Sequence, residues 1–463
     1  MSRMSCDLAI IGGGPSGMAA AVQGAALGLD TILFDEQPAP GGQIYRGIEA
    51  VQRARADDLR ILGEDYEEGA GLVAAFRDSG AAYEPGSVVW QAVEDGRIGT
   101  SHGGAARILT AQRILIATGA MERPVPIPGW TLPGVMAAGA AQTLLKANGM
   151  VPDTPVVVVG AGPLLYLVAT QLARAGVTIA AVLLTGPDIG MSDALKVPGA
   201  LRAGRTLLKG LAWRNELRGM AVPMIHGVSQ PVIEGKAQAE AVSYTVGGTR
   251  HRVPAGLVLL HNGIIPNTQL SLGARCKQAW DPGQHCWRPE TNEWGATNHA
   301  RIAVAGDGAG ILGARAAACL GRMAALDAAV RLGKLDPAQR DRMASADRAQ
   351  LATQQSLRGV LDRLFPPAGE LLVPIGPEDL VCRCEEVTVA ELLDAVAQGC
   401  TEANRVKAFT RCGMGPCQGR VCGPIAAEVI ARALGQGADR SGQFRVRLPV
   451  RPVPLAELAE LQS

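Results

Sequence analysis

The chain is poor in the residue types that usually carry catalysis and nucleic-acid binding. Among its 463 residues, aromatic residues make up 3%, there are six histidines, and the formal net charge is +1. A charge this close to zero excludes a strong electrostatic preference for nucleic acid or for an anionic membrane surface. The histidines, including His261 and His285, stand in no local motif. We therefore expect no catalytic residue for substrate chemistry on this chain.

Long apolar runs are missing as well. The most apolar stretch, 156–169, spans 14 residues, whereas a helix that crosses a bilayer needs roughly 20. It is interrupted by Gly160, Gly162 and Pro163, so a buried strand that turns into a buried helix explains it better. We expect no transmembrane segment. The short polar start of the chain carries no secretory signal, which favours a cytoplasmic location.

The start of the chain reads as a dinucleotide-binding unit. An apolar strand, 7–11, leads into the loop G-x-G-x-x-G, a small-residue helix follows, and a second strand, 31–34, ends in two acids. The glycines allow a tight turn and close approach of a pyrophosphate, and an acid at the end of the second strand typically binds the ribose. The residues expected to bind the dinucleotide are Gly12, Gly14, Pro15, Ser16, Gly17, Asp35 and Glu36.

Two later motifs indicate a flavin. A strand, 113–116, closes on Ala117, Thr118 and Gly119, and another, 301–305, closes on Gly306 and Asp307. They resemble the flavoprotein disulfide reductase class, in which such an aspartate binds the ribityl chain of FAD. This resemblance implies a helix from residue 309 that points its N-terminus at the flavin. Asp307 could instead be a plain helix N-cap.

A glycine-rich segment follows the second strand of the first unit. In folds of this class, the residues 41–43, including Gly42 and Gln43, lie near the isoalloxazine ring. An ordinary glycine turn is the alternative.

A second strand–loop–helix unit starts at residue 156 and looks degenerate. Its loop runs from Gly160 to Leu165, where pyridine-nucleotide domains carry Gly or Ala for close packing. The next strand, 178–184, is followed by neither an acid for a ribose nor an arginine for a 2′-phosphate. No C-x-x-C motif lies in this region, so a disulfide reductase active site is absent. We predict an NAD(P)-like domain whose ligand site is damaged.

Six of the ten cysteines lie between residues 382 and 422, and four of these six form the pattern C-R-C, 27 residues, then C-G-M-G-P-C. Four thiolates are the ligands that a [2Fe–2S] cluster needs. Zinc is the alternative, but C-x-C is tighter than the usual spacing at structural zinc sites. Cys422 reads as a buried thiol, or else as a substitute ligand. The predicted metal ligands are Cys382, Cys384, Cys412 and Cys417.

Together these motifs resemble one family over nearly the whole chain. The segments C-R-C-E-E-V-T and T-R-C-G-M-G-P-C-Q-G-R resemble the bacterioferritin-associated-ferredoxin-like [2Fe–2S] module. Attached to a two-domain flavoprotein, they are similar to the flavoprotein (α or A) subunits of heteromeric amino-acid and opine dehydrogenases. This family includes opine oxidases, proline and hydroxyproline dehydrogenases, and the B subunit of hydrogen cyanide synthase.

The resemblance also implies cofactors and partners. It implies FAD, a [2Fe–2S] cluster, and in some relatives an FMN at a subunit interface. A β subunit resembling a D-amino-acid oxidase, with its own FAD, would oxidise the C–N bond. Some members add a small ferredoxin-like subunit. Any membrane contact would be peripheral, through the electron acceptor.

The expected fold is α/β, with two Rossmann-like domains of the disulfide reductase flavoprotein type and a small helical [2Fe–2S] domain. The expected ranges are 1–125 with 291–365 for FAD, 126–290 for the NAD(P)-like domain, 366–435 for the cluster, and 436–463 for an extended tail. The expected function is electron transfer from the β subunit to a quinone, dye or ferredoxin-type acceptor. The alternative is a stand-alone NAD(P)H-dependent reductase.

Overall fold

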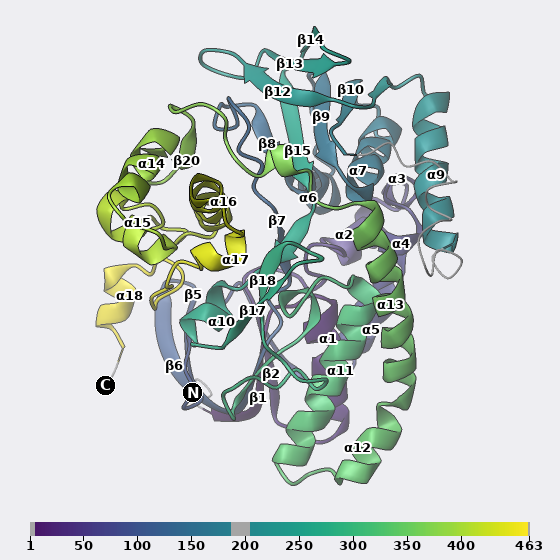
Figure 1. The fold of residues 1–463 in the computed structure, drawn as a ribbon. Coiled ribbons are helices and arrows are strands. Elements are labelled where there is room, and N and C mark those ends of the chain that lie inside the picture. Colours follow the sequence, from purple (N-terminus) through teal and green to yellow (C-terminus); the bar gives the residue numbers. More distant parts are fainter. Residues whose placement is uncertain (1–4, 187–203, 462–463) are drawn as a thin grey trace.

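The computed structural model describes residues 5–186 and 204–461, and it contains a mixed sheet and a parallel sheet with a helical unit beside them (Figure 1). The first sheet forms where the apolar segments of the N-terminal unit pair. Strands β1 (Ser5–Ile11), β2 (Thr31–Asp35), β3 (Ala82–Pro85), the end of β6 (Ala105–Ile116) and β19 (Ile302–Val304) run parallel. The first half of β6 pairs antiparallel with β5 (Arg97–His102), which pairs with β4 (Val88–Ala92).

Three helices pack in a row beside this sheet. Helix α1 (Pro15–Ala26) packs against α11 (Ala314–Arg331), and α11 packs in turn against α13 (Ser345–Leu364). The expected helix start at residue 309 is wrong: Gly306–Gly308 form a 3-10 turn, and α11 begins at Ala314. Four short helices, α2 (Ile48–Ala54), α3 (Asp58–Leu62), α4 (Glu64–Glu67) and α5 (Gly69–Arg77), follow β2, and α12 (Pro337–Met343) precedes α13.

The second sheet is wholly parallel, in the order β11-β10-β9-β15-β8. It contains β8 (Val135–Ala137), β9 (Val156–Ala161), β10 (Ile179–Leu184), β11 (Met224–Ile225) and β15 (Leu257–Asn262), with helices α6 (Ala138–Asn148), α7 (Pro163–Arg174) and α9 (Gly204–Gly219). An antiparallel sheet of β12 (Ser229–Glu234), β13 (Ala241–Val246) and β14 (Thr249–Pro254) lies beyond it (Figure 1). Within the described residues, no helix is both long and apolar enough to span a bilayer.

Two crossing strands join the sheets. Strand β7 (Ala120–Glu122) leaves the first sheet, and β16 (Ile264–Pro266) returns from the second and pairs antiparallel with it. Helix α10 (Gln269–Gly273) and the hairpin of β17 (Gln278–Asp281) and β18 (Cys286–Pro289) follow. Although the expected NAD(P)-like range ends at residue 290, Leu270 and Cys276 belong to the core of the first sheet.

The C-terminal unit packs on the second sheet. It contains β20 (Leu380–Cys382), β21 (Val387–Thr388), α14 (Val389–Ala397), α15 (Ala403–Thr410) and α16 (Cys422–Leu434). Its apolar residues share one core with β9 and β15. The tail then crosses to the first sheet, where Val446 and Val450 are buried, and it includes the short helices α17 (Ala438–Ser441) and α18 (Leu455–Ala459).

Candidate cofactor and metal site

In the first glycine loop, at residues 12–17, the backbone lies so close to neighbouring backbone atoms that Gly12 and Gly17 have no room for a side chain. A Cβ atom on Gly12, whose φ is +112°, would lie 2.5 Å from the carbonyl oxygen of Ala117. One on Gly17 would lie 1.9 Å from the carbonyl oxygen of Gly12. The loop therefore packs on the end of β6 and closes onto the start of α1, which leaves the helix N-terminus and its backbone N–H groups facing the loop.

Four segments distant in the sequence meet around this loop. A Cβ on Gly42 would lie 2.7 Å from Gly14 Cα, and one on Gly306 would lie 2.8 Å from the Cβ of Ser16. A Cβ on Gly308 would lie 3.4 Å from the carbonyl oxygen of Gly119. The structure thus brings the predicted segments at 12–17, 41–43, 117–119 and 306–307 together at the carboxyl ends of the parallel strands, which is where open α/β sheets bind ligands.

Two buried oxygen atoms in this cradle lack a well-aligned hydrogen bond from the protein. Asp35, at the end of β2, accepts from Gln37 N at 3.0 Å through Oδ1, while its buried Oδ2 lies beside Gly13 without a well-aligned hydrogen bond. Burial raises the pKa of this carboxyl to about 6. The Oγ of Ser16 is buried and has no hydrogen-bond partner. A ribose hydroxyl and a pyrophosphate of FAD are suitable partners for a carboxylate and a helix N-terminus, so these residues fit the cofactor that the sequence predicts.

Not every predicted cofactor residue points to a ligand. Glu36 is exposed and forms an ion pair with Arg451 of the tail, with 2.8 Å between Oε2 and Nη2. Asp307 Oδ1 accepts from the backbone N–H groups of Leu312 and Gly313 at 2.9 Å each. This aspartate therefore holds the residues just before α11, which explains why that helix begins later than expected. Gln43 is exposed, and its Oε1 accepts from Thr143 Oγ1 at 3.3 Å.

The second glycine loop, which starts at Gly160, resembles the first in its backbone packing but differs in the side chains around it. A Cβ on Gly160 would lie 1.7 Å from the carbonyl oxygen of His261, so this loop is as tightly built as the first. Leu165 is fully buried in α7 and joins the core. The predicted strand–loop–helix is present, but the position that is normally small is filled by an apolar side chain.

A segment of the chain itself lies over this second loop. Phe365 and Pro366, which follow α13, line a small pocket together with Gly160, Gly162 and His226. Asn262, at the end of β15, fixes this segment by two hydrogen bonds: its Nδ2 donates to the oxygen of Ala368 at 3.1 Å, and its Oδ1 accepts from the Ala368 N–H at 2.8 Å. The linker thus lies next to the second glycine loop, at the carboxyl edge of the second sheet, where open α/β sheets bind their ligands.

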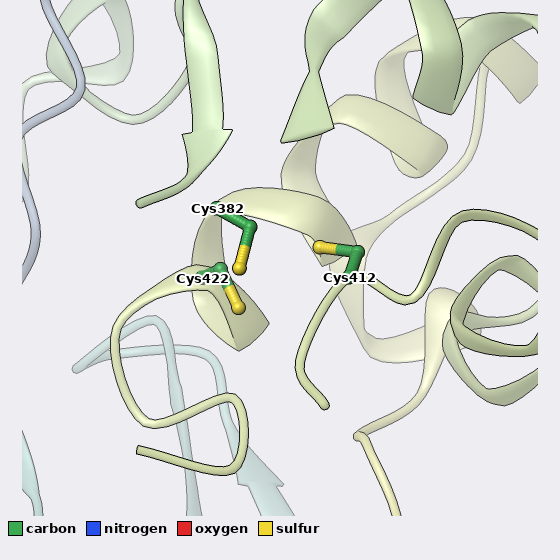
Figure 2. A group of neighbouring side chains, drawn as sticks. All are labelled: Cys382, Cys412 and Cys422. Atoms are coloured by element: carbon green, nitrogen blue, oxygen red, sulfur yellow. The ribbon is translucent and has the colours of Figure 1, made fainter. Parts of the chain in front are cut away.

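The cysteines of the C-terminal unit come together from three elements. The sulfur atoms of Cys382 at the end of β20, Cys412 after α15, and Cys422 at the start of α16 all lie within 4.8 Å of one another. Figure 2 shows the three side chains turned toward a common point. All three are buried, and all ten cysteines of the chain are free thiols, so the group forms no disulfide.

The two remaining predicted ligands extend this group. The sulfur of Cys384 is a neighbour of Cys417, and the sulfur of Cys422 is a neighbour of Cys417 and Cys382. The thiols of Cys412 and Cys422 lower the pKa of Cys382 far below its ordinary value, and the thiol of Cys422 lowers the pKa of Cys417 to about 5. Five sulfur atoms are therefore neighbours, and Cys422, which reads from the sequence as a buried thiol, touches three of the others, Cys382, Cys412 and Cys417.

Backbone geometry adapts the loop to this group. Backbone N–H groups of Glu385 and Gly413 donate to Cys382, and those of Gly419 and Val421 donate to Cys417. Hydrogen bonds of this kind stabilise thiolates and tune the potential of iron–sulfur clusters. A Cβ on Gly415 would lie 2.2 Å from Cys384 Cβ, so the chain passes too closely for any other residue there. The donor set fits a metal centre held by thiolates.

The tail closes the cysteine loop from outside. A Cβ on Gly413 or Gly419 would lie 2.6 Å or 2.5 Å from the ring of Phe444, and both glycines have positive φ. Gln418, beside Cys417, donates to the oxygen of Pro449 at 2.5 Å and accepts from the Arg447 N–H at 2.9 Å. The tail thus packs on its own chain and contacts the backbone and side chains of the cysteine loop.

Comparison with known proteins agrees with this arrangement. The pyridine nucleotide-disulphide oxidoreductase family matches residues 6–333, and the sarcosine oxidase A3 domain matches residues 377–461. The second match covers the cysteine loop and the tail as one unit. The crystal structure of L-proline dehydrogenase from P. horikoshii has the same fold, with a TM-score of 0.71 at 19% identity over 99% of this chain and 80% of that one. The predicted fold class is confirmed.

Sequence relatives are similar over their whole length. The opine oxidase A subunit of Agrobacterium tumefaciens is 42% identical over 464 residues, which cover 98% of this chain and 92% of the relative. The HcnB subunit of hydrogen cyanide synthase from Pseudomonas aeruginosa is 32% identical over 473 residues and 98% of each chain. These likenesses confirm the family resemblance seen in the motifs. The chain belongs to the pyridine nucleotide-disulphide oxidoreductase family and, within it, to the flavoprotein A subunits of the heteromeric opine oxidase and hydrogen cyanide synthase type.

Proposed function

We propose that this chain is the electron-transfer subunit of a heteromeric FAD-dependent amino-acid or opine dehydrogenase. The observation that carries the proposal is the combination, in one chain, of a dinucleotide cradle, a five-cysteine group and a second nucleotide site covered by the linker at 365–368. Such a chain has binding sites for two redox cofactors, while its usual entry for NAD(P)H is filled. Electrons then enter from a partner.

The first cradle is assigned to FAD. Asp35 and the start of α1 would hold its ribose and pyrophosphate, and the segments at 41–43, 117–119 and 306–308 would surround the rest. A flavin takes up an electron pair and releases single electrons, which a one-electron metal centre requires. The role of the protein residues is to bind and orient the cofactor and to set its electrostatic surroundings. FMN, if the complex contains it, would lie at a subunit interface.

The cysteine group is assigned to a [2Fe–2S] cluster. Cys382, Cys384, Cys412 and Cys417 are the ligands that the motif predicts, and Cys422 belongs to the same group. We propose that Cys422 is one of the four ligands, because its sulfur contacts three of the other four. Zinc would be held by the same thiolates but could not accept an electron.

The substrate pocket would lie on another chain. The expected partner is a β subunit that resembles a D-amino-acid oxidase and removes two electrons from the substrate C–N bond. A small ferredoxin-like subunit would be a third component. Electrons would leave toward a quinone, dye or ferredoxin-type acceptor, in the cytoplasm or at the membrane surface. Opine oxidation is the activity for which the relatives about 40% identical to this chain are named.

An anaerobic visible spectrum of the purified chain, before and after addition of NADH or NADPH, tests the proposal. We expect flavin bands with an iron–sulfur shoulder that persist with both nucleotides and bleach with dithionite. Bleaching within the mixing time by either nucleotide would contradict the proposal and favour the stand-alone reductase. Iron and acid-labile sulfide in a 1:1 ratio would distinguish the cluster from zinc.

A further inference from the structure

The C-terminal unit is strongly basic in a chain that is almost neutral as a whole. Residues 401–451 contain nine arginines and lysines against three aspartates and glutamates, whereas the whole chain has a net charge of +1. This segment includes α15, the cysteine loop at 411–420, α16 and the first part of the tail. Figure 1 shows α15 on the outer side of the C-terminal unit, away from both sheets. Such a concentration of positive charge favours a partner of the opposite sign.

One edge of the cysteine group reaches the surface of this basic segment. Cys384 is exposed and Cys417 is half-buried, whereas the other three cysteines of the group are buried. The rate of electron tunnelling falls steeply with distance, so a centre held by these sulfurs would exchange electrons most readily at this edge. We call it the Cys384 edge.

Apolar side chains lie beside the exposed sulfur. A Cβ on Gly415 would lie 2.2 Å from the Cβ of Cys384, so the loop passes directly over this cysteine. The residues on either side of Gly415 are Met414, which is 41% exposed, and Pro416, which is exposed as well. Encounters between redox proteins bury little surface, so a patch of this size is sufficient for one.

The tail adds positive charge next to the cysteine loop. It runs along the loop in extended form, and the Arg447 N–H donates to the Oε1 of Gln418 at 2.9 Å. Its residues alternate between Phe444 and Val446, which are buried, and Arg445 and Arg447, which are exposed. Within the described residues, neither of these two arginines forms an ion pair. Their charges are therefore available to a second molecule.

Charge balance of the cysteine group is the alternative reason for these basic residues. Two half-buried cations meet that need, because Lys407 and Arg420 lie close enough to the cysteine sulfurs for the charges to interact. Arg445 and Arg447 point into water, where the high dielectric constant and salt weaken their effect on buried sulfurs. The exposed arginines thus exceed what the cysteine group requires.

We propose that the Cys384 edge docks an acidic one-electron carrier protein of the ferredoxin type. This inference rests on the proposed electron-transfer function. Met414 would contact the carrier beside the exposed sulfur, and Arg445 and Arg447 would attract its carboxylates and orient it. Each encounter moves one electron, so that this chain is oxidised by one electron and the carrier is reduced by one, and no bond or proton changes. Two encounters clear the electron pair that a flavin receives from one substrate molecule.

Calorimetric titration of the oxidised full-length chain with an acidic plant-type [2Fe–2S] ferredoxin tests the docking surface. We expect one saturable site at low salt and a Kd that rises with NaCl concentration, because ions screen the attraction. Arg445→Glu combined with Arg447→Glu should raise the Kd about tenfold, since both charges are reversed while the backbone hydrogen bonds remain. Met414→Glu, which places a carboxylate beside Cys384, should weaken binding without any change in the tail.

The matched control reverses two exposed arginines elsewhere. Arg53→Glu combined with Arg342→Glu gives the same change in net charge, but these residues lie on α2 and α12, away from the cysteine loop (Figure 1). This control should keep the Kd of the wild type. All variants should keep their flavin and iron, which shows that they fold. Cytochrome c, a basic one-electron carrier, should not bind.

The outcomes separate the docking surface from the proposed function. No saturable ferredoxin binding by a chain that contains flavin and iron would overturn the docking surface and leave electron transfer intact. An unchanged Kd in the Arg445 and Arg447 variant, equal weakening in the control, or equal binding of cytochrome c would overturn it too. So would loss of a co-expressed β subunit from a variant that binds ferredoxin normally, because the edge would then belong to that subunit. A wild-type chain that takes up neither flavin nor iron would instead overturn the proposed function.

Discussion

Asp35 shows at the level of one residue how a binding site costs stability. Its pKa is raised from the ordinary 3.8 to about 6, mainly by burial, so the folded state binds more protons than the unfolded state between these values. The contribution of this carboxyl to the stability of the cofactor-free chain therefore falls by about 3 kcal/mol as the pH rises from about 4 to 6. At neutral pH the carboxylate is charged, and Oδ2 lacks a well-aligned hydrogen bond from the protein. A cofactor that donates to it would recover part of this free energy.

We expect Asp35→Asn to make the cofactor-free chain more stable at pH 7 and to weaken FAD binding at least fivefold, through loss of a charged acceptor. Urea unfolding of the cofactor-free chain at pH 4 and at pH 7 measures the first effect, and FAD titration measures the second. The variant should also lose the fall in stability between these pH values. Glu36→Gln is the matched control, because this acid is exposed and pairs with Arg451. Unchanged FAD affinity in Asp35→Asn would show that the cofactor does not contact the carboxylate.

The cysteine group gives a second prediction for single residues. Cys422→Ser should lower the iron content of the purified chain to below half, because it removes the sulfur that contacts Cys382, Cys412 and Cys417. Cys400→Ser, which changes a thiol buried elsewhere in the same unit, should keep its iron. Iron analysis and electron paramagnetic resonance of the reduced chains provide the measurement. Full iron in Cys422→Ser would return this residue to the role of a core thiol, and full iron in a parallel Cys412→Ser variant would identify Cys412 as the sulfur that is left over.

Cys422 also shows why a ligand set predicted from sequence alone is incomplete. It lies five residues after Cys417 and starts α16, so its spacing offered the only signal. Its proximity to Cys382 depends on how α16 packs against β20, a contact between segments 40 residues apart in the sequence. The glycine loops were predictable because their geometry is local. A strand, a G-x-G-x-x-G loop and a helix specify one another within a single unit.

At the level of elements, the linker after α13 has the largest functional effect. The sequence predicts that Phe365 and Pro366 belong to a linker between domains. No feature of the local sequence predicts that these two residues contact the Gly160 loop. The two hydrogen bonds between Asn262 and the backbone of Ala368 create that contact. Similarly, α11 begins at Ala314 because Asp307 holds the N–H groups of residues 312 and 313. The linker contact joins residues 106 apart in the sequence, so no local pattern reveals it. The hydrogen bonds of Asp307 span only five and six residues, and here the expectation places the helix start directly after the G-D motif.

Loss of the hydrogen bonds between Asn262 and Ala368 should change the stability of the chain and the rate of proteolysis in the linker. Asn262→Ala leaves the N–H and C=O groups of Ala368 unpaired, which should lower the free energy of unfolding by about 1–3 kcal/mol. Proteolysis near residues 365–377 should accelerate at the same time. Asn148→Ala, an exposed change at the end of α6, should change neither. Equal proteolysis of Asn262→Ala and the wild type would show that the linker is held by other contacts.

At the level of the whole molecule, the three units are not independent. The C-terminal unit shares a core with the second sheet, and the tail shares a core with the first. Through Phe444 and the backbone near Pro449, the tail also fixes the cysteine loop. The expectation of a separate extended tail therefore misses its role, because the sequence of a proline-rich segment does not reveal where it docks.

A truncation after Gly442 should therefore lower iron content severalfold, although it removes no cysteine. Without the Phe444 ring, the segment around Gly413 and Gly419 loses its packing partner. Truncation after Pro454 removes only α18, which contains no buried residue, and should leave the iron in place. The iron-to-flavin ratio of each purified chain is the readout. Equal ratios in both truncations would mean that the tail contributes nothing to the metal centre.

The linker over the second glycine loop has one further consequence. A flavoprotein that exchanges hydride with NADH equilibrates with the nicotinamide pool of the cell, so its oxidation state follows general metabolism. Under the proposed function, Phe365 and Pro366, which lie beside the Gly160 loop, would prevent this exchange. The cofactors of this subunit would then be reduced only while its own substrate is being consumed, and the insulation would be built into the fold instead of depending on nucleotide concentrations.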